Sequence, residues 1–309
     1  MKPLLGAALC LWFGSVLAME SIAVGPHSYY VKGGSGPVSA GNRGFNSNAG
    51  FVITSDGVVV FDALGTPALG KELIAEIRRR TSQPIRLLIL SHYHADHIYG
   101  AEAFRAAGAK VWAHREGQGY LHSDLAQQRL QERQGVLKRW IPSGFKLLEP
   151  DRWLEADETF EFGGVRFALR HIGPAHSPED LALTVQPDGV LFAGDLLFEG
   201  RIPFLGDAES RVWLAALDHL QADGVKQLVP GHGLAFADAG DSIDLTRRYL
   251  QDLRAKMRDA VQQMESFDSA YAKTNWGQWA KLPAFEAANR GNAYTVYLEM
   301  ERESLQATP

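Results

Sequence analysis

The chain has 309 residues, of which 46% are hydrophobic and 22% are charged, a composition typical of a globular protein with a sizeable core. Its 31 basic and 36 acidic side chains give a formal net charge of −5. This balance offers no electrostatic case for binding nucleic acid or an anionic membrane surface. A small-molecule substrate is therefore the expected partner.

The N-terminus has the features of a secretory signal peptide. Lys2 precedes an apolar run from Leu4 to Leu17, and Ala18 supplies the small residue that signal peptidase needs before its cleavage point. The run is too short to span a bilayer comfortably. We expect residues 1–18 to be removed, which predicts a mature chain without a transmembrane anchor and a periplasmic or secreted location.

The only cysteine, Cys10, lies inside this predicted signal peptide. The mature chain would then contain no disulfide and no thiolate. Any metal ligand must therefore be a nitrogen or an oxygen atom.

The rest of the chain alternates between β-hairpins and strand–helix units. Apolar runs bounded by Gly- or Asp-containing turns indicate strands, and helical spacing of apolar residues indicates helices. In chain order we expect a hairpin over 51–62, a helix over 68–80, a strand over 85–90, a helix beginning at 100–104, a strand over 110–113, a helix over 116–138, hairpins over 160–167 and 181–193, a helix over 211–220, a strand over 227–230, and helix from 242 to near the end.

Hairpins and strand–helix units recur in two halves of similar composition. This pattern predicts an α/β (α+β) fold in which two mixed β-sheets pack face to face with helices outside. No linker-like boundary follows the signal peptide. We therefore expect a single domain over residues 19–309, with a helical C-terminal segment from about 240 to 307.

Four candidate metal ligands follow the apolar strand over 85–90 directly. They are His92, His94, Asp96 and His97, in the sequence Ser-His-Tyr-His-Ala-Asp-His. A strand that ends in clustered imidazoles and a carboxylate delivers them to one edge of a sheet. Because neutral imidazole and carboxylate are the ligands of open, catalytic zinc sites, the cluster predicts a metallohydrolase centre.

Three further candidates, His176, Asp195 and His232, lie far along the chain. Each stands where an expected strand gives way to a loop marked by glycine or proline. Taken singly, each is more typical of an ordinary turn residue than of a metal ligand. Repeated placement at strand ends is nevertheless what a site on the rim of a sheet requires.

The seven residues in this order resemble the metallo-β-lactamase superfamily. The resemblance implies an αββα sandwich with the site at one rim between the sheets. It implies that His92, His94 and His176 hold a first metal ion, that Asp96, His97 and His232 hold a second, and that Asp195 bridges both. The implied cofactor is Zn²⁺, two ions per chain, with iron as the alternative.

Individual residues indicate which branches of the superfamily the chain resembles. The absence of a mature cysteine excludes the β-lactamases with a cysteine ligand, and His94 argues against the flavodiiron relatives. Asp195, in Gly-Asp-Leu-Leu-Phe, resembles the metal site of glyoxalase II. The segment 200–207, Gly-Arg-Ile-Pro-Phe-Leu-Gly-Asp, resembles the exported SoxH-like subgroup, some of whose members are named quinoprotein relay system zinc metallohydrolases. That resemblance implies a periplasmic quinoprotein system as a candidate partner.

The chemistry expected of such a centre is hydrolysis of a thioester, an ester or a lactam. Two divalent ions can share a hydroxide and stabilise the oxyanion that forms on the attacked carbonyl. Asp96 is the predicted catalytic residue, which would orient the nucleophile and carry a proton. Three alternatives remain open: β-lactam hydrolysis as the main activity, a mononuclear iron enzyme resembling persulfide dioxygenases, and a non-catalytic metal-binding accessory protein.

Four other residues are candidates for supporting roles. Phe198, Arg201 and Phe204 follow Asp195 closely and could line the entrance for substrate. His171 precedes His176 and could contact a metal ligand. Ordinary loop packing accounts for these residues equally well.

Overall fold

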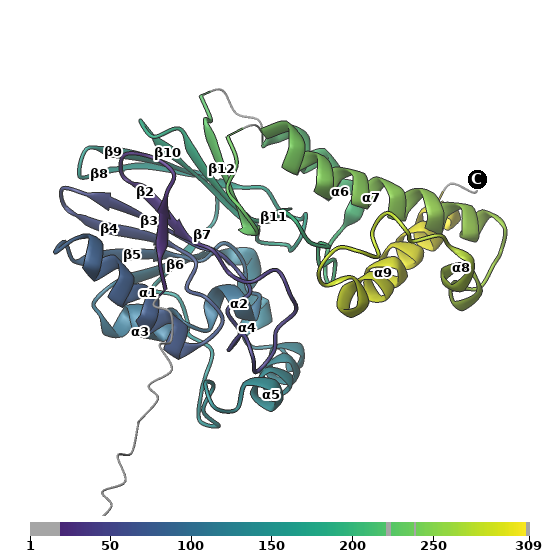
Figure 1. Ribbon diagram of the computed structural model, residues 1–309, viewed down its shortest axis with the longest axis horizontal. Coiled ribbons are helices and arrows are strands. Elements are labelled where there is room, and N and C mark those ends of the chain that lie inside the picture. The colour runs from purple at the N-terminus through teal and green to yellow at the C-terminus, as the bar shows by residue number, and fades with distance from the viewer. Residues whose placement is uncertain (1–18, 221–223, 238, 307–309) are drawn as a thin grey trace, which may run out of the picture.

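The computed structural model describes residues 19–220, 224–237 and 239–306 (Figure 1). The signal peptide predicted over residues 1–18 lies outside them. Among the described residues the strands form two sheets. The larger has the order β1 (Ser21–Ala23), β2 (Ser28–Val31), β3 (Ala49–Thr54), β4 (Gly57–Phe61), β5 (Ile85–Ile89), β6 (Lys110–His114) and β7 (Arg152–Leu154). The smaller has the order β12 (Gln227–His232), β11 (Val190–Phe198), β10 (Leu181–Gln186), β9 (Val165–His171) and β8 (Glu158–Phe162).

Helices cover the outer faces of both sheets and extend beyond them at the C-terminal end (Figure 1). Those associated with the larger sheet are α1 (Pro67–Arg80), α2 (Ala95–Ile98), α3 (Ala101–Ala106), a 3₁₀ turn at Arg115–Gly117, α4 (Gln118–Leu121) and α5 (Asp124–Leu137). Those on the side of the smaller sheet are α6 (Ser210–His219), α7 (Ala239–Gln262), α8 (Phe267–Lys273) and α9 (Phe285–Gln306).

The core has one apolar layer between the sheets and one behind each of them. Phe61 of β4 faces Phe192 of β11 across the sandwich, with ring centroids 6.0 Å apart. Leu73 of α1 packs in the layer behind the larger sheet, and Trp213 of α6 packs in the layer behind the smaller one. This arrangement confirms the predicted αββα sandwich, because each sheet buries both of its faces.

The three predicted hairpins are confirmed, and part of the larger sheet is parallel. Strands β3 and β4, β8 and β9, and β10 and β11 pair antiparallel across short turns. Strands β4, β5, β6 and β7 run parallel. Their carboxyl ends therefore meet at one edge, and the loop that follows β5 carries the histidine cluster to this edge.

Two predicted helices are interrupted in the structure. The helix expected over 116–138 divides into the 3₁₀ turn, α4 and α5, because Ser123 caps α5 by accepting a hydrogen bond from the backbone N–H of Ala126 at 3.1 Å. The helical C-terminal segment divides into α7, α8 and α9, and Ala284 takes a left-handed backbone conformation just before α9. Strands β1, β2 and β7 and helix α2 were not predicted.

Two placements at strand ends differ from expectation. Asp195 lies within β11, which continues to Phe198, and His232 is the last residue of β12 rather than part of a following loop. The single domain expected over 19–309 stays a prediction. No helix within the described ranges combines the length and apolar character needed to cross a membrane.

Candidate metal centre

Seven buried side chains converge at the rim of the sandwich, where the carboxyl ends of β5, β11 and β12 approach one another. One group comprises His92, His94, His176 and Asp195, and a second comprises Asp96, His97 and His232. Within each group, the potential ligand atoms all lie within 4.8 Å of one another. The structure thus brings together every site residue predicted from the sequence, and it divides them into two adjacent groups.

The loop after β5 delivers ligands to both groups. His92 lies in a bend of this loop, and His94, with an extended backbone, occupies the position before the first turn of α2. Asp96 and His97 lie in that turn, where the backbone N–H of His97 bonds to the carbonyl of His94 at 2.9 Å. The change from extended chain to helix therefore separates the first pair of side chains from the second.

Asp195 contacts both groups. Its Oδ2 lies 3.3 Å from Nε2 of His176 and 3.3 Å from Nε2 of His232, and its Oδ1 lies 3.1 Å from Nε2 of His97. Gly231 of β12 makes this placement possible, because a Cβ there would lie 2.0 Å from Oδ1 of Asp195. The geometry matches the bridging position implied by the sequence resemblance.

The nitrogen atoms of the first group have the spacing of ligands around one ion. Nδ1 of His94 lies 3.0 Å from Nε2 of His92 and 2.9 Å from Nε2 of His176. Ligands at 2.0–2.1 Å from a tetrahedral zinc ion would be roughly 3.3 Å apart. In the second group, Nε2 of His97 and the nearby Oδ1 of Asp195 are both buried without a hydrogen-bond partner. These residues therefore fit a pair of metal ions.

Burial and neighbouring charges set His92, His176 and Asp195 in the protonation state that metal binding requires. Burial lowers the pKa of His92 well below its usual value and that of His176 to about 3. Burial would raise the pKa of Asp195, but His232 and His97 outweigh it and lower that pKa well below its usual value. Neutral imidazole and ionised carboxylate are the metal-binding forms.

The imidazole of His97 does not share this protonation state. Burial opposes its charged form, but the carboxylates of Asp195 and Asp62 outweigh burial and raise its pKa well above the usual value. A metal ion at the second group must therefore displace a proton from His97.

A second layer of polar contacts orients the ligands. Asp62 accepts hydrogen bonds from Nδ1 of His97 at 2.8 Å and from the backbone N–H of Ser91 at 2.7 Å. Oγ of Ser91 in turn lies 2.8 Å from Nδ1 of His92. Asp62 has a φ of 69°, a left-handed conformation that is uncommon outside glycine and often found at functional sites. Such partners fix the imidazole tautomers.

The residues that hydrogen-bond to the candidate ligands, such as Asp62, were not identified from the sequence. Asp62 follows the buried strand β4 directly, and the strand-end criterion used for His92 applies equally to it. Asn46, whose Nδ2 donates to Oδ2 of Asp96 at 2.9 Å, lies in an irregular loop with no pattern that could have identified it. His171, considered as a possible contact of a metal ligand, is instead a hydrogen-bonded residue: its Nε2 lies 2.9 Å from the carbonyl of Pro178, and its ring stacks on His114.

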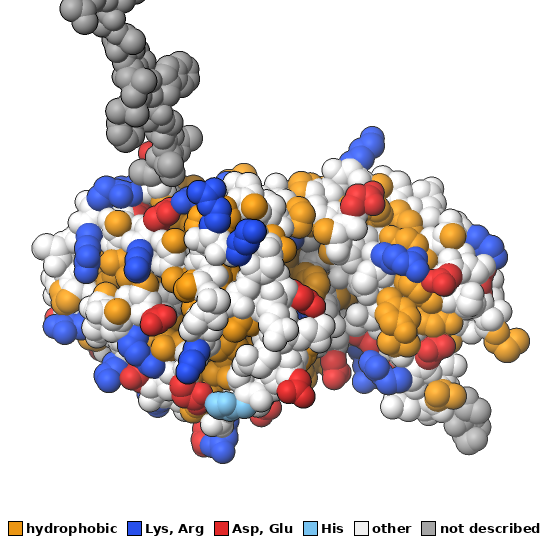
Figure 2. Space-filling model, turned by 90° about the horizontal axis from the view of Figure 1, so that it is seen from below, with side chains coloured by type: hydrophobic (Ala, Val, Ile, Leu, Met, Phe, Trp, Pro, Cys, Tyr) orange, Lys and Arg blue, Asp and Glu red, His pale blue; other side chains and the backbone are white. Residues whose placement is uncertain are grey.

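A cavity of about 290 Å³ opens in front of the ligands. Its wall includes Arg201 and Phe204, two of the proposed entrance residues, whereas Phe198 is buried and stacks on the ring of His232. Residues of α5 and of the C-terminal segment at 284–288 complete the wall. Figure 2 looks onto a face of the molecule that is hollowed between the sandwich and the C-terminal helices. The C-terminal helices thus help to form the substrate-sized space.

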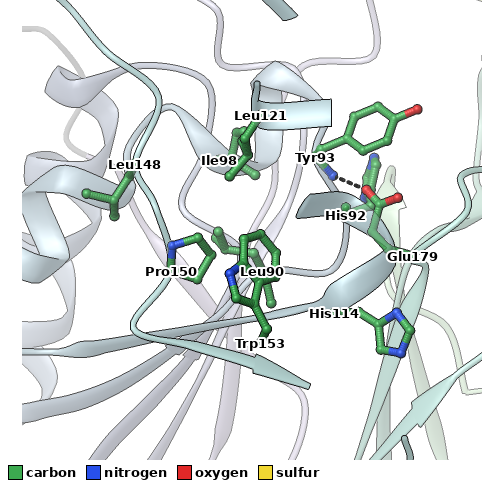
Figure 3. A pocket seen from close by; sticks show the side chains of 12 residues that line it. Leu90, His92, Tyr93, Ile98, His114, Leu121, Leu148, Pro150, Trp153 and Glu179 are labelled. Atoms are coloured by element: carbon green, nitrogen blue, oxygen red, sulfur yellow. Dashed lines mark hydrogen bonds between the residues drawn. The ribbon is translucent and has the colours of Figure 1, made fainter. Parts of the chain in front are cut away.

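A second, much smaller pocket lies behind the histidine loop (Figure 3). It encloses about 20 Å³ between apolar side chains such as Leu90 and Trp153. Glu179 at its edge accepts a hydrogen bond from the backbone N–H of Tyr93 at 2.7 Å, and burial raises the pKa of this carboxyl well above its usual value. The pocket is too small for a substrate, and Glu179 supports the backbone between His92 and His94.

The fold and the site define a class of protein. The family model of the metallo-beta-lactamase superfamily matches residues 42–232, a span that contains all seven converging residues. The chain therefore belongs to the metallo-β-lactamase superfamily. Members of this superfamily are typically metal-dependent hydrolases.

Two relatives are identical to this chain at about a quarter of the aligned residues. The chain is 28% identical over 155 residues to the hydroxyacylglutathione hydrolase GloC of Haemophilus influenzae, covering 48% of this chain and 69% of that protein. It is 24% identical over 193 residues to the type 2 metallo-β-lactamase of Elizabethkingia meningoseptica, covering 61% and 69%.

Two further similarities extend over more of the chain. The linear primary-alkylsulfatase of a Pseudomonas species is 22% identical over 275 residues, covering 79% of this chain but half of that protein. A solved metallo-β-lactamase structure from Pontibacter korlensis superimposes with a TM-score of 0.59 at 23% identity, covering 76% of this chain and 99% of that one. The structural match supports the sandwich fold.

Proposed function

We propose that this protein is an exported, dinuclear zinc-dependent hydrolase that cleaves a thioester or activated ester. The observation that carries the proposal is the position of Asp195, whose two oxygens contact histidines of both ligand groups. A carboxylate placed between two sets of ligands suits a pair of ions that share it. With a single metal ion at the first group, Asp96, His97 and His232 would be buried polar side chains with no ion to bind.

The donor set favours zinc. All seven side chains offer nitrogen or oxygen, the mixed imidazole–carboxylate set that zinc takes in catalytic sites. Two zinc ions bound there would lower the pKa of a water molecule to about 7 and polarise the attacked carbonyl. Iron with a persulfide substrate remains the alternative that metal analysis must exclude.

Asp96 is suited to hold and accept the proton of the attacking water. Burial would raise its pKa, but His97, Arg133 and His232 outweigh burial and keep the carboxyl ionised. Its Oδ2 is oriented by the amide of Asn46 at 2.9 Å. Hydrolysis then breaks the bond between the carbonyl carbon and the leaving sulfur or oxygen, and the proton taken from water passes to the leaving group.

The choice of substrate rests on resemblance. Asp195 in its Gly-Asp-Leu-Leu-Phe context resembles glyoxalase II, and the GloC relative is by its name a thioester-type hydroxyacylglutathione hydrolase. The relatives named metallo-β-lactamases keep lactam hydrolysis as the second candidate. Because another relative is named a linear primary-alkylsulfatase, sulfate esters should also be tested as substrates.

The decisive experiment combines metal analysis with a substrate panel. Protein purified anaerobically should contain two zinc ions per chain and should turn over S-acyl thioesters faster than a chromogenic cephalosporin or an alkyl sulfate. A single tightly bound iron ion, with no hydrolysis of any panel member, would overturn the proposal. A cephalosporin turned over faster than every thioester would replace it with the β-lactamase function.

The export signal and the SoxH-like segment support a periplasmic or secreted location, with a quinoprotein system as partner. Mass spectrometry of the native protein should find an N-terminus at Met19, and retention of Met1 would contradict export. A pull-down from the periplasmic fraction with the zinc-loaded protein should enrich a quinoprotein dehydrogenase component. Its absence, at bait levels that recover a control complex, would remove the partner from the proposal.

A further inference from the structure

The loop between β11 and α6, residues 199–209, brings an exposed aromatic ring to the cavity. Phe204 of this loop lines the cavity and is 42% exposed. Its ring meets the ring of His94 edge-on, with the centroids 5.7 Å apart. The neighbouring side chains of Ile202 and Leu205 are fully buried. An exposed aromatic ring in a cavity wall, beside a candidate metal ligand, is suited to contact a substrate.

One side chain of α9 holds the backbone on both sides of Phe204. Oδ1 of Asn292 accepts a hydrogen bond from the backbone N–H of Leu205 at 2.9 Å, and its Nδ2 donates to the backbone carbonyl of Pro203 at 2.7 Å. Asn292 is 1% exposed. Buried backbone groups need partners, and here a side-chain amide supplies them as a neighbouring strand would. The place of Phe204 in the cavity wall therefore depends on Asn292.

The amide of Asn292 is itself oriented by α7. Its Nδ2 also donates to the hydroxyl of Tyr249, at 2.9 Å. The three hydrogen bonds use both protons of the amide and its oxygen, so the side chain has one orientation that satisfies all of them. Leucine has the same branched shape but can make none of these bonds. It would leave two buried backbone groups of the loop without a partner, which favours a different loop conformation.

Two further features of the loop bear on the same ring. The backbone N–H of Ile202 donates to the carbonyl of Pro283, just before α9, at 3.0 Å. A Cβ at Gly206 would lie 2.5 Å from Cε1 of Phe204, so the ring occupies space that only glycine leaves open. The C-terminal segment and the loop thus form one unit that sets the position of the ring.

We propose that Asn292 is a positioning residue that holds Phe204 where its ring contacts an apolar group of the substrate beside the metal ligands. The ring packs against an alkyl or aryl group next to the bond that is hydrolysed. The C-terminal helices in this way take part in substrate selection. This inference rests on the proposed hydrolase function and specifies the substrate class of the same site.

A double-mutant cycle tests whether Asn292 acts through Phe204. The phenylacetyl and acetyl thioesters of N-acetylcysteamine contain the same scissile group and differ in the apolar group beside it. Wild type should have a KM about 10-fold lower for the phenylacetyl thioester. F204A and N292L should each abolish that difference, with kcat for the acetyl thioester within twofold of wild type. The double variant should match F204A, because a ring that is absent cannot be displaced.

Thiol binding measures the same preference without hydrolysis. A thiolate binds zinc or iron directly, so 2-phenylethanethiol and ethanethiol place a large and a small apolar group at the metal centre of the loaded full chain. Calorimetry should show about 10-fold tighter binding of the phenyl compound by wild type and equal binding of the two thiols by F204A and N292L. The preference is measurable even if neither thioester is hydrolysed, a result that would overturn the proposed function alone.

Asn289 supplies a matched control one turn before Asn292. It is 0% exposed, and its amide bonds to the hydroxyls of Tyr249 and Tyr271 rather than to the loop. N289L should keep the preference of wild type. Hydrogen exchange of the metal-depleted chain should show faster exchange of the Leu205 amide in N292L and an unchanged rate in N289L. Equal effects of the two variants would mean a general loosening of the C-terminal helices and would overturn the positioning role.

G206A carries the test if N292L fails to fold. Its added methyl group displaces the ring of Phe204 while both backbone bonds to Asn292 can stay in place, so the preference for the phenyl compounds should fall. Wild type that binds both thiols equally would overturn the substrate contact. A preference that survives F204A would do the same, and one that survives N292L or G206A would overturn the positioning of the ring.

Discussion

The two ligand groups differ in what surrounds them. In the first group, His176 packs against the ring of Trp213 at 5.2 Å, and its Nδ1 has no hydrogen-bond partner. In the second group, His97 and Asp96 are held by polar partners, Asp62 and Asn46. Apolar packing therefore positions His176 of the first group, and a hydrogen-bonded network positions His97 and Asp96 of the second.

Both groups reach the substrate cavity. Asp96 and His232 of the second group and His94 and Asp195 of the first line that cavity, whereas His92, His97 and His176 do not. Changes to the ligands that line the cavity should therefore affect metal binding and substrate turnover together. Changes around the ligands behind them should affect metal binding or stability alone.

Asp195→Ala should have the largest effect, because the carboxylate oxygens of Asp195 contact histidines of both groups. Removing it leaves two sets of ligands, and two dications, without their shared carboxylate. We expect a loss of activity of about 10³-fold or more, the range seen when a metal site or a catalytic unit is broken. Zinc content after gel filtration measures the accompanying loss of metal. A variant that keeps both ions and most of its activity would contradict the bridging role.

Asp96→Asn should separate chemistry from metal binding in the second group. The amide keeps the shape of the side chain but cannot accept a proton, so kcat should fall about 10²-fold with a smaller change in KM. Metal content must be measured in the same sample, since lost zinc would imitate lost chemistry. Near wild-type kcat with both ions bound would exclude the proton-carrying role.

Asp62→Asn should weaken metal binding at the second group more than at the first. Asp62 accepts a hydrogen bond directly from Nδ1 of His97, and losing such a partner typically costs 10- to 100-fold in metal affinity. Its link to His92 of the first group is indirect, through the hydroxyl of Ser91. Competition with a zinc chelator should reveal one ion with strongly reduced affinity and one ion with a smaller loss. Equal losses of affinity for the two ions would contradict this order.

Sequence reasoning located the seven converging residues because each stands at or near the end of an apolar strand, in a family-like order. It could not locate Asn46 or Arg133, because their importance depends on how a loop and a surface helix fold over the rim. Asp62 could have been identified, since it directly follows strand β4. Its left-handed backbone could not be read from its residue type.

Elements of the fold that depend on tertiary contacts were also difficult to predict from the sequence. Hairpins such as β3–β4 have strong local signals, and the structure confirms them. The three-residue strands β1 and β7 are too short for an alternating pattern and form through pairing with their neighbours. The helix predicted over 116–138 failed because the cap provided by Ser123 was overlooked. Tertiary pairing and capping, more than periodicity, decide these short elements.

The smallest predicted effect concerns His114, which lies behind the first group in the small pocket of Figure 3. Burial, with a further contribution from the neighbouring His171, lowers its pKa from 6.5 to about 4. The folded protein thus favours the neutral ring, whereas the unfolded chain binds a proton below about pH 6.5. The stabilising contribution is present above that pH and declines as the pH falls toward the folded-state pKa.

His114→Asn removes this titration. In urea, metal-depleted wild type should have a higher free energy of unfolding than the variant at pH 7.5. This difference should be smaller by about 1–2 kcal/mol at pH 5. Zinc stoichiometry at pH 7.5 should not change, because His114 belongs to neither ligand group. An advantage that stays constant with pH would mean that His114 is not held neutral. Loss of zinc at pH 7.5 would show that the first group depends on the pocket behind it as well as on its own apolar packing.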